Sequence, residues 1–232
     1  MGNAPFLAMT AAEIRANPDI SAPMGWMACQ FSPWGTGLSN LPDTLPEGSL
    51  LILNDQMPWC GQDPELIVMQ LEERLNTLAC HGLLLDLQRP RTEEVSRLVQ
   101  LICSELNCPV GVPEGYASGI SCPVFLPPVP LHQTVGDYLT PWQGREVWLE
   151  LALDAEEILL TPEGASSTPL LPWDAPEPTH HEDSLHCGYS VTLEENRARF
   201  TLSRTAEDIR SLLEEAANYG VTTAIGLWQE LA

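Results

Sequence analysis

Apolar runs that end in polar side chains recur along the chain. The stretches Gly82–Gln88 and Leu50–Gln56 both contain a run of leucine or isoleucine residues, which is followed by Asp86 and Gln88 in the first and by Asn54, Asp55 and Gln56 in the second. Such a run is typical of a strand that is buried on both faces of a parallel sheet. Parallel α/β sheets build their sites at the carboxyl ends of their strands, so these polar residues mark a candidate site.

Between such runs, apolar residues follow helical spacing. In the segment that follows Asp63 and Pro64, an N-cap and an N1 proline, apolar positions recur every three or four residues up to Leu78. The predicted helices follow Thr10, Asp63, Thr92 and Thr205, and a weaker helix is predicted between Thr134 and Leu139.

About eight strands alternate with these helices. The predicted strands are Met24–Phe31, Leu50–Gln56, Gly82–Gln88, Val110–Val112, Ser121–Leu126, Glu146–Leu153, a hairpin from Tyr189 to Leu202, and Val221–Trp228. The alternation predicts an α/β fold, a (β/α)8 TIM-type barrel slightly shorter than the usual ~250 residues, with a β-hairpin insertion before the last helix and strand. An open doubly wound sheet is the alternative, but no Gly-x-Gly-x-x-Gly or Walker-type loop follows any strand.

The 232 residues are expected to form one barrel domain. Residues 1–22 contain a capped short helix and are predicted to be an N-terminal cover segment. Residues 161–187 are rich in proline and show little periodicity, which predicts a long surface loop.

The charge of the chain limits its partners. Ten basic residues, all arginine, stand against thirty-two acidic residues, for a formal net charge of −22. Such a surface repels phosphate backbones and anionic lipids, so we expect no nucleic-acid partner and no membrane. Residues 1–22 lack the basic and apolar regions of a secretory signal, which favours a cytoplasmic location. The seven scattered cysteines favour buried thiols in a reducing compartment over disulfides or a zinc site.

The strongest indication of a catalytic site is on one face of the predicted strand Gly82–Gln88. Because side chains alternate along a strand, Leu84, Asp86 and Gln88 point one way, and a carboxylate and an amide lie side by side. Two further carboxylates, Glu114 at a strand end and Glu150 on the same face as Trp148, are candidates for acid or base chemistry with Asp86, and so is Asp55.

Two stretches resemble the family 18 (chitinase-like) glycoside hydrolases. That family carries Asp-Gly-x-Asp-x-Asp-x-Glu at the end of its fourth barrel strand, and His81–Gln88 is similar to it at Gly82 and Asp86. The stretch Tyr219–Trp228 resembles the last strand of the family, with Trp228 as a floor for the sugar. The two stretches cover about a fifth of the chain.

The departures from the family motif bear on function. In the family the final Glu protonates the glycosidic oxygen while the acetamido group of the substrate attacks, and the middle Asp orients that group. The resemblance assigns the proton-donor position to Gln88, which has no proton to give, and Leu84 replaces a second carboxylate. Loss of a general acid costs about 10²–10⁴ in rate, so the resemblance implies an impaired enzyme.

The candidate residues follow from these arguments. Asp86, Gln88, Glu114 and Glu150 occupy candidate catalytic positions. The candidate substrate-binding residues are aromatic or amide side chains at predicted strand ends and loops: Trp228, Tyr116, Trp148, Asn54, Gln56 and Trp34. We expect no cofactor and no metal, because the His180–Cys187 segment fits no standard zinc spacing.

Three functions remain open at this stage. The first is a catalytically impaired barrel that binds a saccharide, with an N-acetylhexosamine-containing glycan suggested by the resemblance. The second is an active glycosidase that uses a rearranged carboxylate pair. The third is a non-catalytic scaffold that binds a protein partner through residues 161–187.

Overall fold

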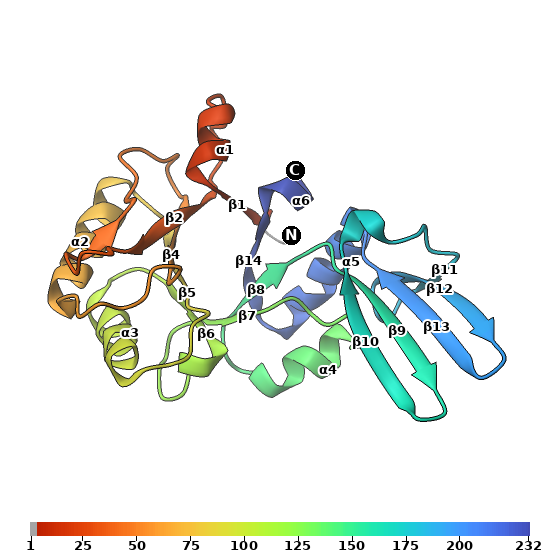
Figure 1. Ribbon diagram of the computed structural model, residues 1–232. Helices are drawn as coiled ribbons and strands as arrows, with labels where there is room; N and C mark the ends of the chain where they lie inside the picture. The colour runs from red at the N-terminus through yellow and green to blue at the C-terminus, as the bar shows by residue number, and fades with distance from the viewer. Residues whose placement is uncertain (1–3) are drawn as a thin grey trace.

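A computed structural model describes residues 4–232, and within them parallel strands close into a barrel (Figure 1). Eight of the nine strands of the main sheet form the barrel, and the short β3 (Leu38–Ser39) adds antiparallel to the outside of β2. The barrel strands are β1 (Phe6–Met9), β2 (Gly25–Phe31), β4 (Leu50–Asn54), β5 (Gly82–Asp86), β6 (Val110–Pro113), β7 (Val124–Leu126), β8 (Val147–Leu151) and β14 (Val221–Leu227).

The barrel closes through its first strand. β1 pairs in parallel with β14 on one side and with β2 on the other, so the predicted TIM-type fold is confirmed. Residues 1–22 were expected to be a cover segment, but Phe6–Met9 supplies the first barrel strand, while residues 1–3 lie outside the described part of the chain. β5 is consequently the fourth barrel strand.

A tryptophan fills the barrel interior. Trp148 on β8 is fully buried among Ala8, Leu50, Ile52, Leu84 and Ile225. A Cβ atom on Gly111 would collide with the indole, so the glycine at this position makes room for the ring, whereas a Cβ atom on Gly82 would collide with the carbonyl oxygen of Pro109. The ring stacks on His81, the exposed residue before β5, with centroids 6.3 Å apart.

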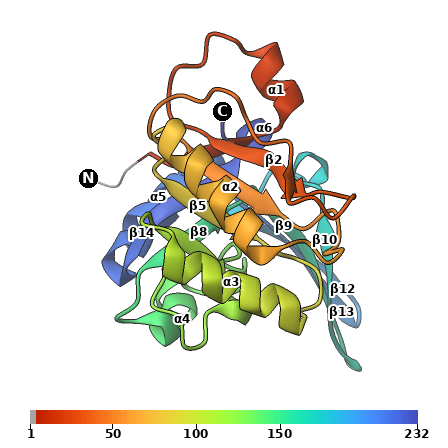
Figure 2. The same cartoon turned by 90° about the vertical axis from the view of Figure 1, so that its left-hand side faces the viewer.

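Helices cover the outside of the barrel. Figure 2 shows α2 and α3 side by side over one flank, with α4 below them. The helices and short helical turns are α1 (Ala11–Ala16), α2 (Pro64–Thr77), α3 (Glu93–Glu105), η1 (Glu114–Tyr116), α4 (Val135–Leu139), η2 (Thr140–Trp142), η3 (Pro172–Asp174), α5 (Ala206–Ala216), η4 (Ala217–Tyr219) and α6 (Trp228–Leu231). The predicted caps Thr10, Asp63, Thr92 and Thr205 all accept hydrogen bonds from the first turn of their helices.

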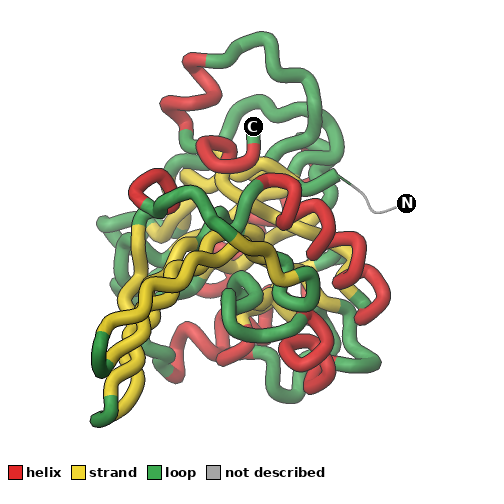
Figure 3. Tube along the Cα trace, turned by 90° about the vertical axis from the view of Figure 1, so that its right-hand side faces the viewer, coloured by secondary structure: helices red, strands yellow, loops and turns green. Residues whose placement is uncertain are grey.

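A second, antiparallel sheet is inserted between β8 and α5. It forms an arm with two long hairpins that project from the barrel (Figures 1 and 3). We call it the insertion sheet, and its strands in spatial order are β10 (Gly164–Leu170), β9 (Ala155–Thr161), β13 (Arg197–Ser203), β12 (Cys187–Glu194) and β11 (His180–Glu182). The predicted hairpin is therefore confirmed as β12 and β13.

The predicted loop at residues 161–187 is wrong over much of its length. β10 and β11 are the two outer strands of the insertion sheet. An edge strand tolerates Pro169, because its backbone nitrogen needs no partner on the open side. β10 is also exposed along almost its whole length, so its sequence lacks the apolar alternation that identifies a strand.

The cysteines are less buried than the sequence suggested. Cys29 and Cys187 are buried and Cys60 is exposed, while the other four are partly exposed and all seven are free thiols. Within residues 4–232, no helix combines the length and the apolar composition that crossing a membrane requires.

Candidate functional site

Four of the candidate residues meet at the carboxyl end of the barrel. Asp86 and Gln88 extend from β5, Glu114 follows β6, and Glu150 lies near the end of β8. Together with Pro113 and other neighbours they line an open hollow of about 340 Å³, which we call the cleft. This volume is at the lower end of the range for small-molecule pockets, ~300–1,000 Å³.

The floor of the cleft is apolar. A narrower hollow of about 60 Å³ lies inside the mouth of the barrel and shares Asp86, Gln88, Phe125 and Glu150 with the cleft. Its remaining lining comes from β1, β2, β4, β5 and β14: Ala8, Met27, Ile52, Leu84, Ile225, Gly226 and Leu227. The polar groups are therefore grouped on the β5 and β8 side of an apolar mouth.

Asp86 and Gln88 act as a pair. The Nε2 of Gln88 donates a hydrogen bond of 3.0 Å to the Oδ1 of Asp86. Burial raises the pKa of the Asp86 carboxyl, the hydrogen bond from Gln88 opposes that rise, and the Asp55 carboxylate adds to it. One oxygen of Asp86 thus already accepts a hydrogen bond from the Gln88 amide.

Glu150 lines the same cleft as this pair, in a partly desolvated position. Burial raises the pKa of its carboxyl from 4.5 to about 7, and the negative charges of Asp86, Asp154 and Glu230 add to the effect. A carboxyl with such a pKa is partly protonated at neutral pH. It is therefore a group that can donate or accept a proton in the cleft.

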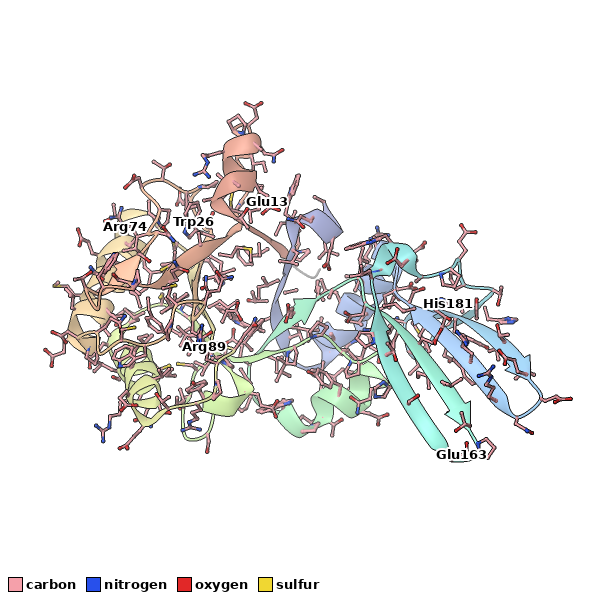
Figure 4. The ribbon with its side chains drawn as sticks, in the orientation of Figure 1. Glu13, Trp26, Arg74, Arg89, Glu163 and His181 are labelled. Carbon is pink, nitrogen blue, oxygen red and sulfur yellow. The ribbon has the colours of Figure 1, made fainter. Side chains whose placement is uncertain are left out.

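Asp55 fixes the backbone next to this pair. Its two carboxylate oxygens accept hydrogen bonds from the backbone N–H groups of Gln88 and Arg89, at 3.0 and 2.8 Å. The Arg89 guanidinium in turn donates to the carbonyl oxygens of Asp55 and Gln56, both at 2.7 Å, and Figure 4 labels this arginine in the barrel region. The sequence suggested Asp55 as an acid or base candidate, whereas its contacts make it a support for the end of β5.

Three predicted binding residues are buried or hydrogen-bonded within the fold and do not face a ligand in the cleft. Trp148 is fully buried in the barrel, so a ligand in the cleft cannot stack on it. Tyr116 is 6% exposed and packs beneath the guanidinium of Arg91, 5.3 Å from the ring centroid. The Asn54 amide donates to the Met27 carbonyl at 2.8 Å and accepts from the backbone N–H of Gln56 at 3.1 Å.

The other predicted binding residues lie away from both hollows. Trp228 is the first residue of α6 and half-buried, and its neighbour Leu227 lines the barrel mouth instead. Trp34 is 84% exposed in the loop between β2 and β3, and Gln56 is exposed beyond the end of β4. Two of the four aromatic residues predicted to bind a ligand, Trp148 and Tyr116, are instead packed in the protein interior. This is the commonest role of a buried tryptophan or tyrosine.

Sequence reasoning missed Phe125, which lines both hollows. It lies on β7 between the buried Val124 and Leu126, so alternation alone places it on the opposite face from them. That signal was present in the sequence. A three-residue strand is too short for the alternation to stand out.

Larger hollows lie on the insertion sheet. One of about 510 Å³ is at the hairpin tips around Glu163, and one of about 640 Å³ lies between β11 and the start of α5 around His181 (Figure 4). Neither receives residues from the ends of the barrel strands. The cleft is the better candidate, because it gathers polar groups whose pKa values are shifted. Within residues 4–232, no group of three or more His, Cys, Asp or Glu side chains could hold a metal ion.

Comparisons with known proteins identify the fold. No protein-family model and no curated protein matches the sequence. Among solved structures, the spore cortex-lytic enzyme SleL of Bacillus cereus is 10% identical with a TM-score of 0.56, covering 100% of this chain and 72% of its own. A chitinase from Chromobacterium violaceum is 9% identical with a TM-score of 0.55, covering 96% of this chain and 93% of its own.

A third structure carries a ligand. It is a Glu-to-Gln mutant of a class V chitinase from Nicotiana tobaccum in complex with NAG4, 10% identical with a TM-score of 0.60, and the match covers 97% of this chain and 93% of that one. At such identities the likeness shows the fold alone. The chain thus has the barrel fold of glycoside hydrolases of the chitinase and spore-glycosylase kind.

Proposed function

We propose that this barrel binds an N-acetylhexosamine-containing glycan in the cleft and that Gln88 leaves it without the hydrolysis of the enzymes it resembles. The observation that carries the proposal is the contact between Gln88 and Asp86 at the end of the fourth barrel strand. The family motif has a proton donor where Gln88 stands. An amide can hold a glycosidic oxygen by a hydrogen bond, but it cannot protonate the leaving group.

The character of the cleft supports a neutral sugar ligand. Phe125, Pro113 and Pro127 offer apolar surface, while Asp86, Gln88 and other polar neighbours offer hydrogen-bond partners for hydroxyl and amide groups. Three carboxyl groups in the lining, those of Asp86, Glu114 and Glu150, disfavour anionic ligands. A neutral N-acetylated sugar has apolar faces, hydrogen-bonding hydroxyl and amide groups, and no negative charge, so it matches this lining.

A structural neighbour supports the proposal that a barrel of this kind binds a glycan when a glutamate is replaced by glutamine. The Nicotiana chitinase was captured with NAG4 while it carried a Glu-to-Gln substitution. In a barrel of this kind such a substitution is therefore compatible with a bound N-acetylglucosamine tetramer. By analogy, the amide of Gln88 is compatible with glycan binding in this chain.

Calorimetric titration with NAG4 tests the binding proposal. We expect the wild-type protein to bind and Asp86→Ala to bind at least about tenfold more weakly, which corresponds to about 1.4 kcal/mol. Glu214→Ala, a substitution of an exposed glutamate on the outside of α5, is the control and is expected to bind like the wild type. Absence of heat with wild-type protein would contradict the proposal and leave the protein-binding scaffold as the better hypothesis.

Restoration of the acid tests the loss of hydrolysis. Gln88→Glu is expected to raise the hydrolysis of an aryl N-acetylchito-oligosaccharide by on the order of 10²-fold, because it supplies a proton donor beside Asp86. Gln56→Glu adds the same charge beyond the end of the neighbouring strand, outside the cleft, and is expected to leave the rate unchanged. Equal rates for the two variants would argue against Gln88 as the former acid position.

A second candidate function rests on Glu150. Its pKa of about 7 suits a general acid, and Asp86 lies close enough to influence it, so the pair could form a rearranged active site. Hydrolysis by the wild-type protein that Glu150→Gln abolishes would favour this candidate. Hydrolysis that is negligible in both proteins would favour the binding function.

A further inference from the structure

The outer strand of the insertion sheet has an open edge. β10 pairs with β9 on one side, and within residues 4–232 no strand pairs with its other side. All residues of β10 are exposed except the last, Leu170, which is half-buried. Figure 1 shows β10 at the margin of the projecting arm. A row of backbone groups along this edge is therefore available to another strand.

The turn between β9 and β10 determines which backbone groups face outward. Thr161 and Gly164 pair across a turn of two residues, so they exchange hydrogen bonds as the closing pair of the hairpin. From Gly164 onward, the backbone groups of β10 point alternately toward β9 and away from it. The N–H and C=O groups of Ala165 and Ser167 and the C=O group of Pro169 therefore point outward.

This edge lacks the charged side chains that usually protect an edge strand. No residue from Gly164 to Leu170 is charged, although the chain has a formal net charge of −22. Natural edge strands commonly carry a lysine or another charge that prevents pairing with a foreign strand. Two copies of so acidic a chain repel each other, and that repulsion is smallest where they meet through an uncharged strand.

We propose that the open edge of β10 pairs with β10 of a second copy of this chain, antiparallel and about a two-fold axis. The two-fold arrangement that overlaps the whole strand is centred on Ser167, with Ala165 of each copy opposite Pro169 of the other. The two Ser167 residues exchange N–H···O=C bonds, and the Ala165 N–H of each copy donates to the Pro169 carbonyl oxygen of the other. Every outward N–H group of the two strands is then paired, although proline has none to give.

The side chains along this contact are compatible with it. Ser166 of each copy lies opposite Thr168 of the other, and directly opposed hydroxyl side chains stabilise a strand pair. The turn at Pro162 and Glu163 comes opposite Leu171, which follows β10 and is 52% exposed. The pairing thus covers an exposed apolar side chain and places no carboxylate opposite another.

The carboxylates of the next strand are too far apart to oppose the contact. Glu156 and Glu157 are on β9, one strand in from the edge, so three strand spacings of together about 14 Å separate them from their counterparts in the second copy. The Debye length at physiological ionic strength is about 8 Å. Salt therefore screens most of the repulsion between these groups.

Sedimentation velocity over a range of concentrations tests the dimer. One strand pair is smaller than the interface of a stable dimer, so we expect mostly monomer at about 5 μM and mostly dimer at about 200 μM. Ser167→Pro removes the central outward N–H group and no bond to β9, and it is expected to be monomeric at both concentrations. Ser167→Ala is the matched control, because it also loses the hydroxyl bond to Glu156 but keeps its N–H group, and it is expected to dimerise like the wild type.

Ser167→Cys tests the register by a measurement that does not depend on a disrupted strand. Opposed Cα atoms in a hydrogen-bonded antiparallel pair are about 5.5 Å apart, within the range of a disulfide. After mild oxidation at about 200 μM protein and digestion, mass spectrometry is expected to find two peptides linked through position 167. Thr192→Cys, at an exposed position on β12, is the control and is expected to give no link through position 192.

Three outcomes would overturn the proposal. A wild type that is monomeric at about 200 μM would leave the edge to a strand of a different protein. A Ser167→Pro variant that dimerises like the wild type would place the contact elsewhere on the chain, and so would the absence of a link through position 167. Glycan binding enters none of these measurements.

Discussion

Burial and neighbouring negative charges both raise the pKa of the Glu150 carboxyl. Its carboxyl is desolvated near the end of β8 and faces the charges of Asp86, Asp154 and Glu230. Charging it costs more in the folded chain than in the unfolded one. The proton on Glu150 therefore links the stability of the fold to pH.

Glu150→Gln is predicted to remove this link. From about pH 4.5 to pH 7 the folded wild type holds a proton that the unfolded chain has lost, so stability falls as pH rises through this window. The variant should therefore be more stable than the wild type by on the order of 2 kcal/mol at pH 8 and by much less at pH 4.5. Urea unfolding at both pH values measures the difference.

The matched control is Glu214→Gln, which removes one charge from an exposed position on α5. Its effect on stability is expected to be small and similar at the two pH values. A pH-independent effect of Glu150→Gln would contradict the assignment of a raised pKa to Glu150.

At the scale of elements, three strands meet at one side chain. β5 and β6 carry Gly82 and Gly111 where the Trp148 ring of β8 fills the barrel. The absence of a Cβ atom on these strands allows the ring to lie against their backbones. The overlap that a side chain would cause is with the indole at Gly111 and with the Pro109 carbonyl oxygen at Gly82.

Gly111→Ala is predicted to be strongly destabilising. Its new methyl group would overlap the Trp148 ring, and overpacking of this kind costs about 1–3 kcal/mol. Gly115→Ala is the control, because a Cβ atom there meets nothing within 4 Å, and its stability is expected to stay close to that of the wild type. Thermal unfolding of both variants checks the comparison, and similar melting temperatures would contradict it.

At the scale of the whole molecule, a buried arginine ties the insertion sheet to the barrel. Arg204 is 4% exposed and donates to the carbonyl oxygens of Val129, Pro130, Leu185 and His186. The first two belong to the segment after β7 and the others to the turn between β11 and β12. Burial lowers the pKa of its guanidinium, while nearby acidic groups oppose that shift.

Arg204→Met is predicted to loosen this junction. It leaves buried carbonyl oxygens without a donor, and we expect a loss of about 3 kcal/mol in the free energy of unfolding. Arg210→Met, on the exposed side of α5, is expected to cost far less. Urea unfolding measures both, and hydrogen exchange in residues 127–131 and 180–204 is expected to rise in Arg204→Met alone.

The sequence by itself determined the repeating strands and helices, the helix caps, and the inward face that carries Asp86 and Gln88. These features depend on residues that are close along the chain, whose spacing and capping are fixed by backbone geometry. A four-residue strand such as β1 and an exposed edge strand such as β10 carry too little pattern to be identified in this way.

Only the tertiary structure decided which distant residues meet. The closure of β1 between β14 and β2, the grouping of Glu114 and Glu150 with Asp86, and the burial of Trp148 all join parts of the chain that are far apart in sequence. Such contacts follow from strand order, register and packing volume, which no local window of sequence contains. The tertiary structure therefore decides the chemistry of the cleft, while local pattern determines the elements that carry it.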